Sequence, residues 1–325
     1  MRLRILHTIL VTTLALFALP PDPAPAQDRF PSRPLKIVVG FTPGGSSDIA
    51  ARVIGEHLAK RLGQPVVIEN KPGAGGALAA DQVAKAPADG YTLLLVPSGH
   101  GVLGAMRQSL PFEVVNDFTW LSTLVTYGMV FGVRPGSPHK SLADVIAASK
   151  AAPNALSYYS VGKGTAHHLL GEWLNAAAGI ELLHVPYRGS GPALTDFMAG
   201  RVDLMIDTMT FALPQTEGGN VRPLAVTSRE RPTAMAGVPF SGAVVDGLEY
   251  ESWLGLCAPK NLPPDVAELL HRTIVESVAS PEFAEKMLTI GAAAKSSTMA
   301  DFRARLEREI ALFSRIVASR SIAKE

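Results

Sequence analysis

The chain has 325 residues and a formal net charge of +1 at pH 7. So balanced a charge argues against nucleic acid or an anionic membrane surface as the partner, because both require a basic protein surface. The length exceeds what a single hydrophobic core comfortably serves, so two domains are expected.

Residues 1–26 have the pattern of an export signal. Arg2 and Arg4 precede a mostly apolar run, and small residues up to Ala26 offer a cleavage site. Cleavage there removes two arginines and one aspartate from the 30 basic and 29 acidic residues, which leaves the mature chain without net charge. The apolar run is too short to favour a membrane span. We therefore expect a periplasmic, monomeric protein whose mature chain is not inserted in the membrane.

The first half of the mature chain alternates short apolar runs with amphipathic ones. This rhythm is typical of βαβ units, in which helices cover both faces of a parallel sheet. Strands are expected at 35–39, 65–69, 92–96, 118–125 and 129–133, and helices at 48–62 and 76–85.

The pattern restarts near Pro135 and ends in a helical tail. The expected fold is α/β with two lobes, each a mostly parallel sheet flanked by helices and joined to the other by crossing strands. Lobe 1 is expected to comprise 27–133 and 250–325, including the C-terminal helices, and lobe 2 to comprise 134–249. Further strands are expected at 156–160, 182–186, 202–207, 222–227 and 250–258, and further helices at 141–151 (capped by Ser141), 165–178, 193–200, 264–279, 281–290 and 300–319.

Two strand–turn–helix segments, at 39–48 and 159–168, share one design. Each passes from a β-branched or aromatic run through glycine and hydroxyl residues into a helical stretch. The first amides of such a helix have no partner within it and lie at the positive end of the helix dipole, where anions bind. The pair predicts two lobes that grip one small anionic ligand.

Further candidate residues follow strands whose carboxyl ends would line a cleft. Ser98 and His100 follow the strand at 92–96, and Arg188 and Asp207 hold equivalent places in the second half. A surface or interdomain salt bridge is an equal alternative for Arg188. Asp207 either receives an amino or hydroxyl group of the ligand or caps a loop.

The adjacent His167 and His168 point about 100° apart on a helix, so they cannot chelate one metal ion. His168 follows the second turn closely enough to donate to a carboxylate, and we favour that role over a buried core histidine. His167 is expected to face solvent.

Motifs of catalysis and cofactor binding are incomplete. The first turn approaches a phosphate-binding P-loop from Gly40 to Ser47 but lacks its lysine, and the hydrolase motif G-x-S-x-G is absent. Cys257, the only cysteine, lies in an apolar run that predicts a buried, unreactive thiol. We expect no catalytic residue, cofactor or metal. A secreted hydrolase that uses Ser98 or Ser160 with a nearby histidine is the alternative.

Together these motifs resemble the Bug-type extracytoplasmic solute receptors, the substrate-binding subunits of tripartite tricarboxylate transporters. The resemblance runs from about residue 30 to the C-terminus. It rests on PSRPLKIVV at 31–39, PGGSSD at 43–48, ENKPGAGG at 69–76, DGYT at 89–92, GxGTxxHL at 162–169, HVPYRG at 184–189, GxVD at 200–203 and LAVT at 224–227.

The resemblance implies a type II-like periplasmic binding protein that closes like a Venus flytrap on a ligand carboxylate and delivers it to membrane transporter subunits. By motif position, it implies contacts from both turns and from a later loop of lobe 2. These residues are Phe41, Thr42, Pro43, Gly44, Gly45 and Ser46 in lobe 1, and Ser160, Gly162, Gly164, Thr165, His168 and Asp207 in lobe 2.

The chain departs from the usual family residues at Thr42, at the loop 98–101 and at Asp207-Thr208-Met209. Each departure touches the expected pocket, so the ligand stays open among dicarboxylates, aromatic acids and amino acids. A ligand sensor that passes its closed form to a signalling partner is an alternative to transport.

Overall fold

Strands and helices alternate along the computed structural model, which describes residues 30–107 and 109–324. Within those residues, ten strands form one mixed sheet in the order β2-β1-β3-β9-β4-β7-β5-β6, and β8 and β10 pair with β4. The expected export signal lies outside the described residues. From Pro31 onward the chain forms one compact unit.

Lobe 1, as we use the term, is the half of the sheet that contains β1, β2, β3, β9, β10 and the first part of β4, with its helices. Here β1 is parallel to β2 and β3, whereas β9 is antiparallel to β3 and β4. Its strands are β1 (Leu35–Val39), β2 (Val66–Asn70), β3 (Thr92–Pro97), β4 (Phe118–Val133), β9 (Glu251–Pro259) and β10 (Ala293–Ala294), and its helices are α1 (Ser46–Leu62), α2 (Ala77–Ala84), α3 (Gly99–Met106), α8 (Pro264–Val278), α9 (Pro281–Leu288) and α10 (Met299–Ser319).

Lobe 2 is the half that contains the last part of β4 and the strands β5 to β8. Here β5 is parallel to β6 and β7, whereas β7 and β8 flank β4 in antiparallel register. Its further elements are α4 (Leu142–Ala151), β5 (Ser157–Ser160), α5 (Ala166–Ala178), β6 (Leu183–Pro186), α6 (Ser190–Met198), β7 (Leu204–Thr208), α7 (Met209–Glu217) and β8 (Arg222–Val226).

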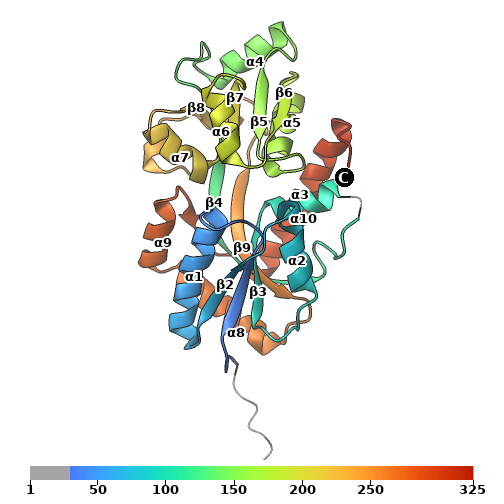
Figure 1. Cartoon of the computed structure of the whole chain (residues 1–325), viewed down its shortest axis with the longest axis vertical. Helices are drawn as coiled ribbons and strands as arrows, with labels where there is room; N and C mark the ends of the chain where they lie inside the picture. Colours follow the sequence, from blue (N-terminus) through green and yellow to red (C-terminus); the bar gives the residue numbers. More distant parts are fainter. Residues whose placement is uncertain (1–29, 108, 325) are drawn as a thin grey trace, which may run out of the picture. The chain divides into compact units, whose positions relative to one another are not determined.

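One strand, β4, runs through both lobes (Figure 1). Up to Gly128 it pairs with β9, and from Met129 onward it pairs with β7 and β8. Thr227 fixes this crossing point, since its Oγ1 accepts from Met129 N at 2.8 Å and its backbone oxygen accepts from Tyr250 N at 3.0 Å. The chain therefore crosses between the lobes along β4 and again at Tyr250, where it enters β9, and we call β4 and β9 the crossing strands.

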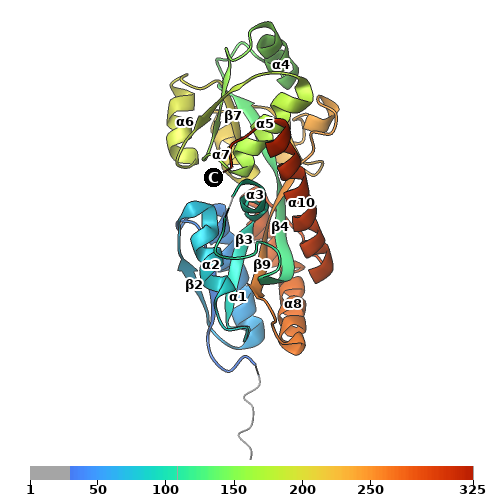
Figure 2. The same cartoon turned by 90° about the vertical axis from the view of Figure 1, so that its right-hand side faces the viewer.

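The last helix, α10, packs against both lobes, and Figure 2 shows it running beside α3 and α5. Phe302 and Leu306 belong to the buried cluster of lobe 1, whereas Phe313 and Ile316 belong to the cluster built around lobe 2. Near its end, Arg320 Nε lies 2.9 Å from the Glu172 carboxylate of α5. The helix α10 thus connects the two lobes through its packing.

Most expected elements are present, with three differences. The expected strands at 118–125 and 129–133 are one continuous strand, and α3 and α7 were not expected. The sheet is also less parallel than expected, because the two crossing strands run in opposite directions. The helix cap at Ser141 is confirmed, since Ser141 and Asp144 bond each other's backbone amides.

Candidate functional site

The first turn, between β1 and α1, is anchored by the buried carboxylate of Asp48. Asp48 accepts from Gly44 N at 3.0 Å, from Asn70 Nδ2 at 2.9 Å and from two nitrogens of Arg52 at 2.9 Å. Burial alone would raise the pKa of Asp48, but these hydrogen bonds, that of Arg52 foremost, hold it below its ordinary value. The left-handed φ of Gly44 (87°) lets the chain bend over this carboxylate.

The second turn, between β5 and α5, is held by neutral groups instead. Ser160 Oγ and Thr165 Oγ1 both donate to Gly162 O, at 3.0 and 2.7 Å, and Ser160 Oγ also accepts from Gly162 N. Gly164 N donates to His168 Nδ1 at 3.2 Å. Gly162 (φ 149°) and Gly164 (φ 69°) supply the backbone angles that other residues rarely adopt.

Both turns line one cavity of about 460 Å³ between the lobes. Phe41, Thr42 and residues 45–47 line it from lobe 1, and residues 161–167 line it from lobe 2. Among the described residues, no hydrogen bond is recorded for the amides of Ser46 and Ser47 or of Ala166 and His167. These are first-turn amides of α1 and α5, so the positive ends of two helix dipoles meet at the cavity.

The cavity wall also carries charged and polar side chains. Arg107, just after α3, lines it from lobe 1, and Lys163 lines it from lobe 2. Asp207 lies at the carboxyl end of β7 and is almost fully buried, and His167 Nε2 lies 3.2 Å from its Oδ1. Ser98 and Ser252 line the cavity with their hydroxyls 2.6 Å apart.

The remaining wall is mostly apolar and comes from α3 and from the crossing strand β4. Leu103, Met106 and Met129 line it, together with Tyr127. Burial raises the pKa of Tyr127 to about 12, so its hydroxyl stays protonated. The cavity therefore offers amide, hydroxyl and cationic groups for an anion beside a surface suited to a hydrocarbon chain or ring.

Comparison with known proteins identifies the family. Residues 50–319 match the family model described as tripartite tricarboxylate transporter family receptor. The chain belongs to this family. Protein BugT of Bordetella pertussis is 35% identical over 293 residues, which cover 89% of this chain and 90% of BugT. This receptor is thus a solute-binding protein and not an enzyme.

Solved structures agree with this assignment. The R. palustris protein Rpa4515 with adipate has a TM-score of 0.83 and 32% identity, over 91% of this receptor and all of that chain. MatC from Rhodopseudomonas palustris with bound malate has a TM-score of 0.78 and 30% identity, over 89% of this receptor and all of that chain. The expected two-lobed binding-protein fold is confirmed.

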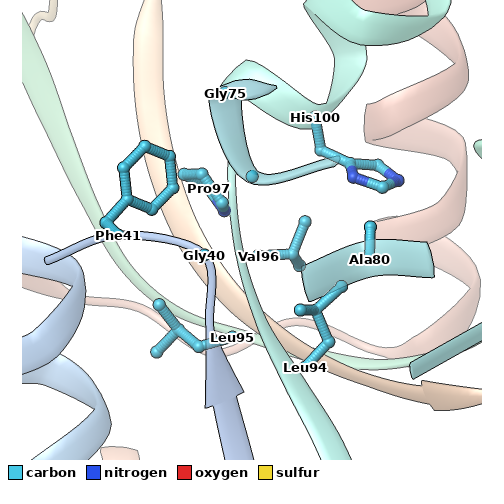
Figure 3. A pocket seen from close by; sticks show the side chains of 10 residues that line it. Gly40, Phe41, Gly75, Ala80, Leu94, Leu95, Val96, Pro97 and His100 are labelled. Atoms are coloured by element: carbon cyan, nitrogen blue, oxygen red, sulfur yellow. The ribbon is translucent and has the colours of Figure 1, made fainter. Parts of the chain in front are cut away.

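His100 lies away from the interlobe cavity, contrary to expectation. The expected loop at 98–101 is instead the start of α3, which turns the imidazole into the core, where Nε2 lies 2.9 Å from Val114 O. Burial lowers the pKa of His100 to about 4, so the ring is neutral. Figure 3 shows its ring over Ala80, across Pro97 from Phe41, beside a hollow of about 10 Å³ that holds one water at most.

The two adjacent histidines have exchanged their expected places. His168 is 4% exposed and stacks on His184 at 4.0 Å, so it is the core histidine. Burial, with a smaller contribution from Lys163, lowers its pKa to about 4. His167, expected to face solvent, has a side chain only 13% exposed and lines the cavity.

Four other expected contact residues do not line the cavity. Arg188 is exposed beyond it, and the neighbouring Gly189 and Ser190 line it instead. Ser160 is fully buried beneath its turn, because its hydroxyl is used to close that turn. The other two, Pro43 and Gly44, are exposed at the outer bend of the first turn.

Four residues line the cavity although the sequence patterns did not predict them there: Arg107, Tyr127, Lys163 and His167. Arg107 follows a helix that was not expected, and Tyr127 lies in the middle of the continuous strand β4. Lys163 lies inside the glycine-rich turn, and its position there was the available signal.

The hydrolase alternative finds no support. Ser160 Oγ lies 2.6 Å from His184 Nε2, but Ser160 is fully buried and no substrate reaches it. Ser98 bonds Ser252 and no histidine in the hydrogen bonds of the described residues. The family match likewise gives no support to a signalling role.

Within residues 30–107 and 109–324, no cluster of three or more histidine, cysteine or acidic side chains could hold a metal ion. No described helix combines the length and apolar character needed to cross a membrane.

Cys257 is buried, and burial raises the pKa of its thiol well above the ordinary value.

Proposed function

We propose that this receptor captures a small carboxylate in the periplasm between its two lobes and delivers it to the membrane subunits of a tripartite transporter. The observation that carries the proposal is the meeting of two helix N-termini, those of α1 and α5, at one cavity. A carboxylate placed there receives amide hydrogen bonds from both lobes. Holding both lobes at once, it would stabilise their closed arrangement.

The proposed ligand contacts follow from the cavity lining. From lobe 1 they are the first turn (Phe41, Thr42, Gly45, Ser46) and Ser98, and from lobe 2 they are Gly162, Gly164, Thr165 and Asp207. Ser160 and His168 are positioning residues, because they hold the second turn through Gly162 and Gly164.

Arg107 and Lys163 add a local positive field to a chain that is nearly neutral. A carboxylate drawn from water into the cavity exchanges water contacts for fixed donors in a less polar environment, where each contact is stronger. Each charge-assisted hydrogen bond contributes about 1.5–3 kcal/mol. Four or five of them support an affinity of roughly 1 μM after the cost of association is subtracted.

The related structures support the ligand class. Rpa4515 with adipate and MatC with bound malate have the same fold, and both ligands are carboxylic acids. A cavity of about 460 Å³ is large enough for either acid or for an aromatic acid.

Residues 1–26 are proposed to direct export and to be removed near Ala26, which places the mature receptor in the periplasm. We further propose that it works as a monomer, with 27–133 and 250–325 as one moving part and 134–249 as the other.

A thermal-shift screen of organic acids tests the proposal. The panel contains monocarboxylates, dicarboxylates, aromatic acids and amino acids, each at several concentrations. An acid at about 100 times its dissociation constant stabilises the fold by about 2.7 kcal/mol, which raises the melting temperature by several degrees. If no acid in the panel shifts the melting temperature, the proposed function is wrong.

A further inference from the structure

We propose that His167 recognises a hydrogen-bond donor, a hydroxyl or an ammonium group, on the carbon next to the bound carboxylate. The inference rests on the proposed function and deepens it, because it names the chemistry of the acid. It concerns a polar pair of side chains that lines the cavity from lobe 2, His167 and Asp207.

The hydrogen bonds of Asp207 define the state of His167. Asp207 Oδ1 lies 3.2 Å from His167 Nε2 and accepts from Thr208 N at 2.8 Å, while its Oδ2 accepts from the Tyr159 hydroxyl at 3.1 Å. A carboxylate only accepts hydrogen bonds, so Nε2 of His167 carries a proton. In the neutral imidazole the other nitrogen, Nδ1, then has an unprotonated lone pair.

This second nitrogen is left without a partner. Nδ1 of His167 is buried and forms no hydrogen bond with any described residue. A buried acceptor without a partner is costly, and the cost is removed when a ligand supplies the donor. His167 lines the cavity, and we infer that a ligand held there as the lobes close supplies the donor.

The position of His167 on α5 selects where on the ligand the donor lies. It is the second residue of the helix, and its own amide and that of Ala166 are among those proposed to bind the carboxylate. A group that reaches the imidazole from the same end of the ligand lies one carbon from the carboxylate. The preferred ligand is therefore a 2-hydroxy or 2-amino acid, and its unsubstituted parent leaves Nδ1 without a partner.

The same pair favours a donor over a second acid group. Asp207 is 1% exposed, and the four groups that bond it carry no fixed positive charge. A ligand carboxylate beside it would meet a like charge, whereas a hydroxyl is tolerated and an ammonium is attracted. The hydroxyl and ammonium forms share the hydrogen-bond donor and differ in charge, so they are separable by experiment.

Calorimetry with matched acids tests the inference. Three sets are used: succinate, malate and aspartate; adipate, 2-hydroxyadipate and 2-aminoadipate; phenylacetate, mandelate and phenylglycine. In the set that binds, the wild-type receptor prefers the 2-substituted acid to its parent by at least about tenfold. Preference for the hydroxy or the amino member identifies the donor.

The decisive variant is His167→Gln, whose amide nitrogen can still donate to Asp207 but which has no acceptor at the Nδ1 position. The preference for the 2-substituted acid over its parent, measured within this variant, falls below about threefold. His139→Gln, the same substitution outside the cavity lining, keeps the full preference. Thermal melts check that both variants fold.

Three results would overturn the inference. The parent acid binds the wild type as tightly as its 2-substituted partner, or His167→Gln keeps the preference, or His139→Gln loses it equally. Each of these leaves carboxylate binding, and hence the proposed function, intact. Failure of all nine acids to bind contradicts the proposed function itself, and the inference falls with it.

Discussion

The two turns that line the cavity have similar sequences but are held by different chemistry. The first rests on a charged network, in which buried Asp48 accepts from Gly44 N, Asn70 and Arg52. The second is closed by two hydroxyls and by the neutral imidazole of His168. The same strand–turn–helix backbone can therefore be held in place by an ionised group or by neutral groups. This difference decides which turn keeps its hydrogen bonds when the pH changes.

The largest expected effect is a selective loosening of the second turn in acid. The pKa of His168 is lowered to about 4 and that of His184 to about 4, in both cases first by burial. When folding lowers the pKa of a histidine, the unfolded state takes up a proton at a higher pH than the folded state does. The free energy of unfolding that this histidine contributes is therefore fully present above about pH 6.5 and is lost as the pH falls toward 4. For His168 the loss approaches about 3 kcal/mol.

Hydrogen exchange of single amides measures this effect. Between pH 7 and pH 5, protection of Gly162 and Gly164 should fall, after correction for intrinsic exchange, while protection of Gly44 stays constant because the pKa of Asp48 is low. Global unfolding is a poorer probe, because burial raises the pKa of Glu309 to about 7 and its contribution to stability changes in the opposite direction. Equal loss of protection in both turns would contradict the comparison.

The second expected effect is a loosening of the first turn by Asp48→Asn. The neutral amide loses the charge-assisted bonds and turns a donor toward Asn70, so the free energy of unfolding should fall by about 2 kcal/mol at neutral pH. Urea unfolding measures it. Arg52→Gln is the matched variant, and since the Arg52 side chain is 52% exposed and screened by water, it should lower the free energy of unfolding much less. Equal costs for the two variants would show that the buried carboxylate is not the anchor.

The smallest expected effect concerns Lys163, a cavity lysine in the second turn that has no counterpart in the first turn. Lys163→Glu should weaken binding of a carboxylate about tenfold, and Lys163→Gln only about threefold, because the first adds repulsion to the loss of attraction. The difference should shrink at high salt, since Lys163 is exposed. Lys150→Glu, an exposed site on α4, is the control. Equal affinities of the two Lys163 variants at low salt would remove this residue from the account.

Most strands and helices could be predicted because their apolar patterns are local. The helix α3 could not, since it contains Gly99, Gly101 and Gly104, which disfavour helices in isolation. Two of these glycines allow α10 to pack closely against α3. A Cβ atom at Gly101 or Gly104 would lie within 3.3 Å of Leu306 or Ile310. Tertiary packing thus decides this helix. The helix α7 was hidden by Pro214 in its interior.

The two turns of the candidate site could be predicted, because glycines and hydroxyls mark them locally. The orientation of the helix that follows could not. In α5, Gly171 packs against the Tyr158 ring so closely that a Cβ would lie 2.2 Å from it. That contact turns the face bearing His168 and Glu172 toward β5, where Tyr158 bonds both residues. His167, about 100° around the helix, then faces the cavity.

The central claim is that both turns hold a single carboxylate, and Gly45 tests it most directly. Its backbone (φ −81°, ψ 169°) suits any residue, and a Cβ there would lie 3.9 Å from its nearest neighbour, so Gly45→Asp and Gly45→Asn both fit and both cap α1. Calorimetry then compares the two variants with an acid that binds the wild type. Because both side chains occupy the same place and differ in charge, the account predicts that the aspartate variant binds the acid at least about a hundredfold more weakly than the asparagine variant. Equal affinities for the two would contradict it.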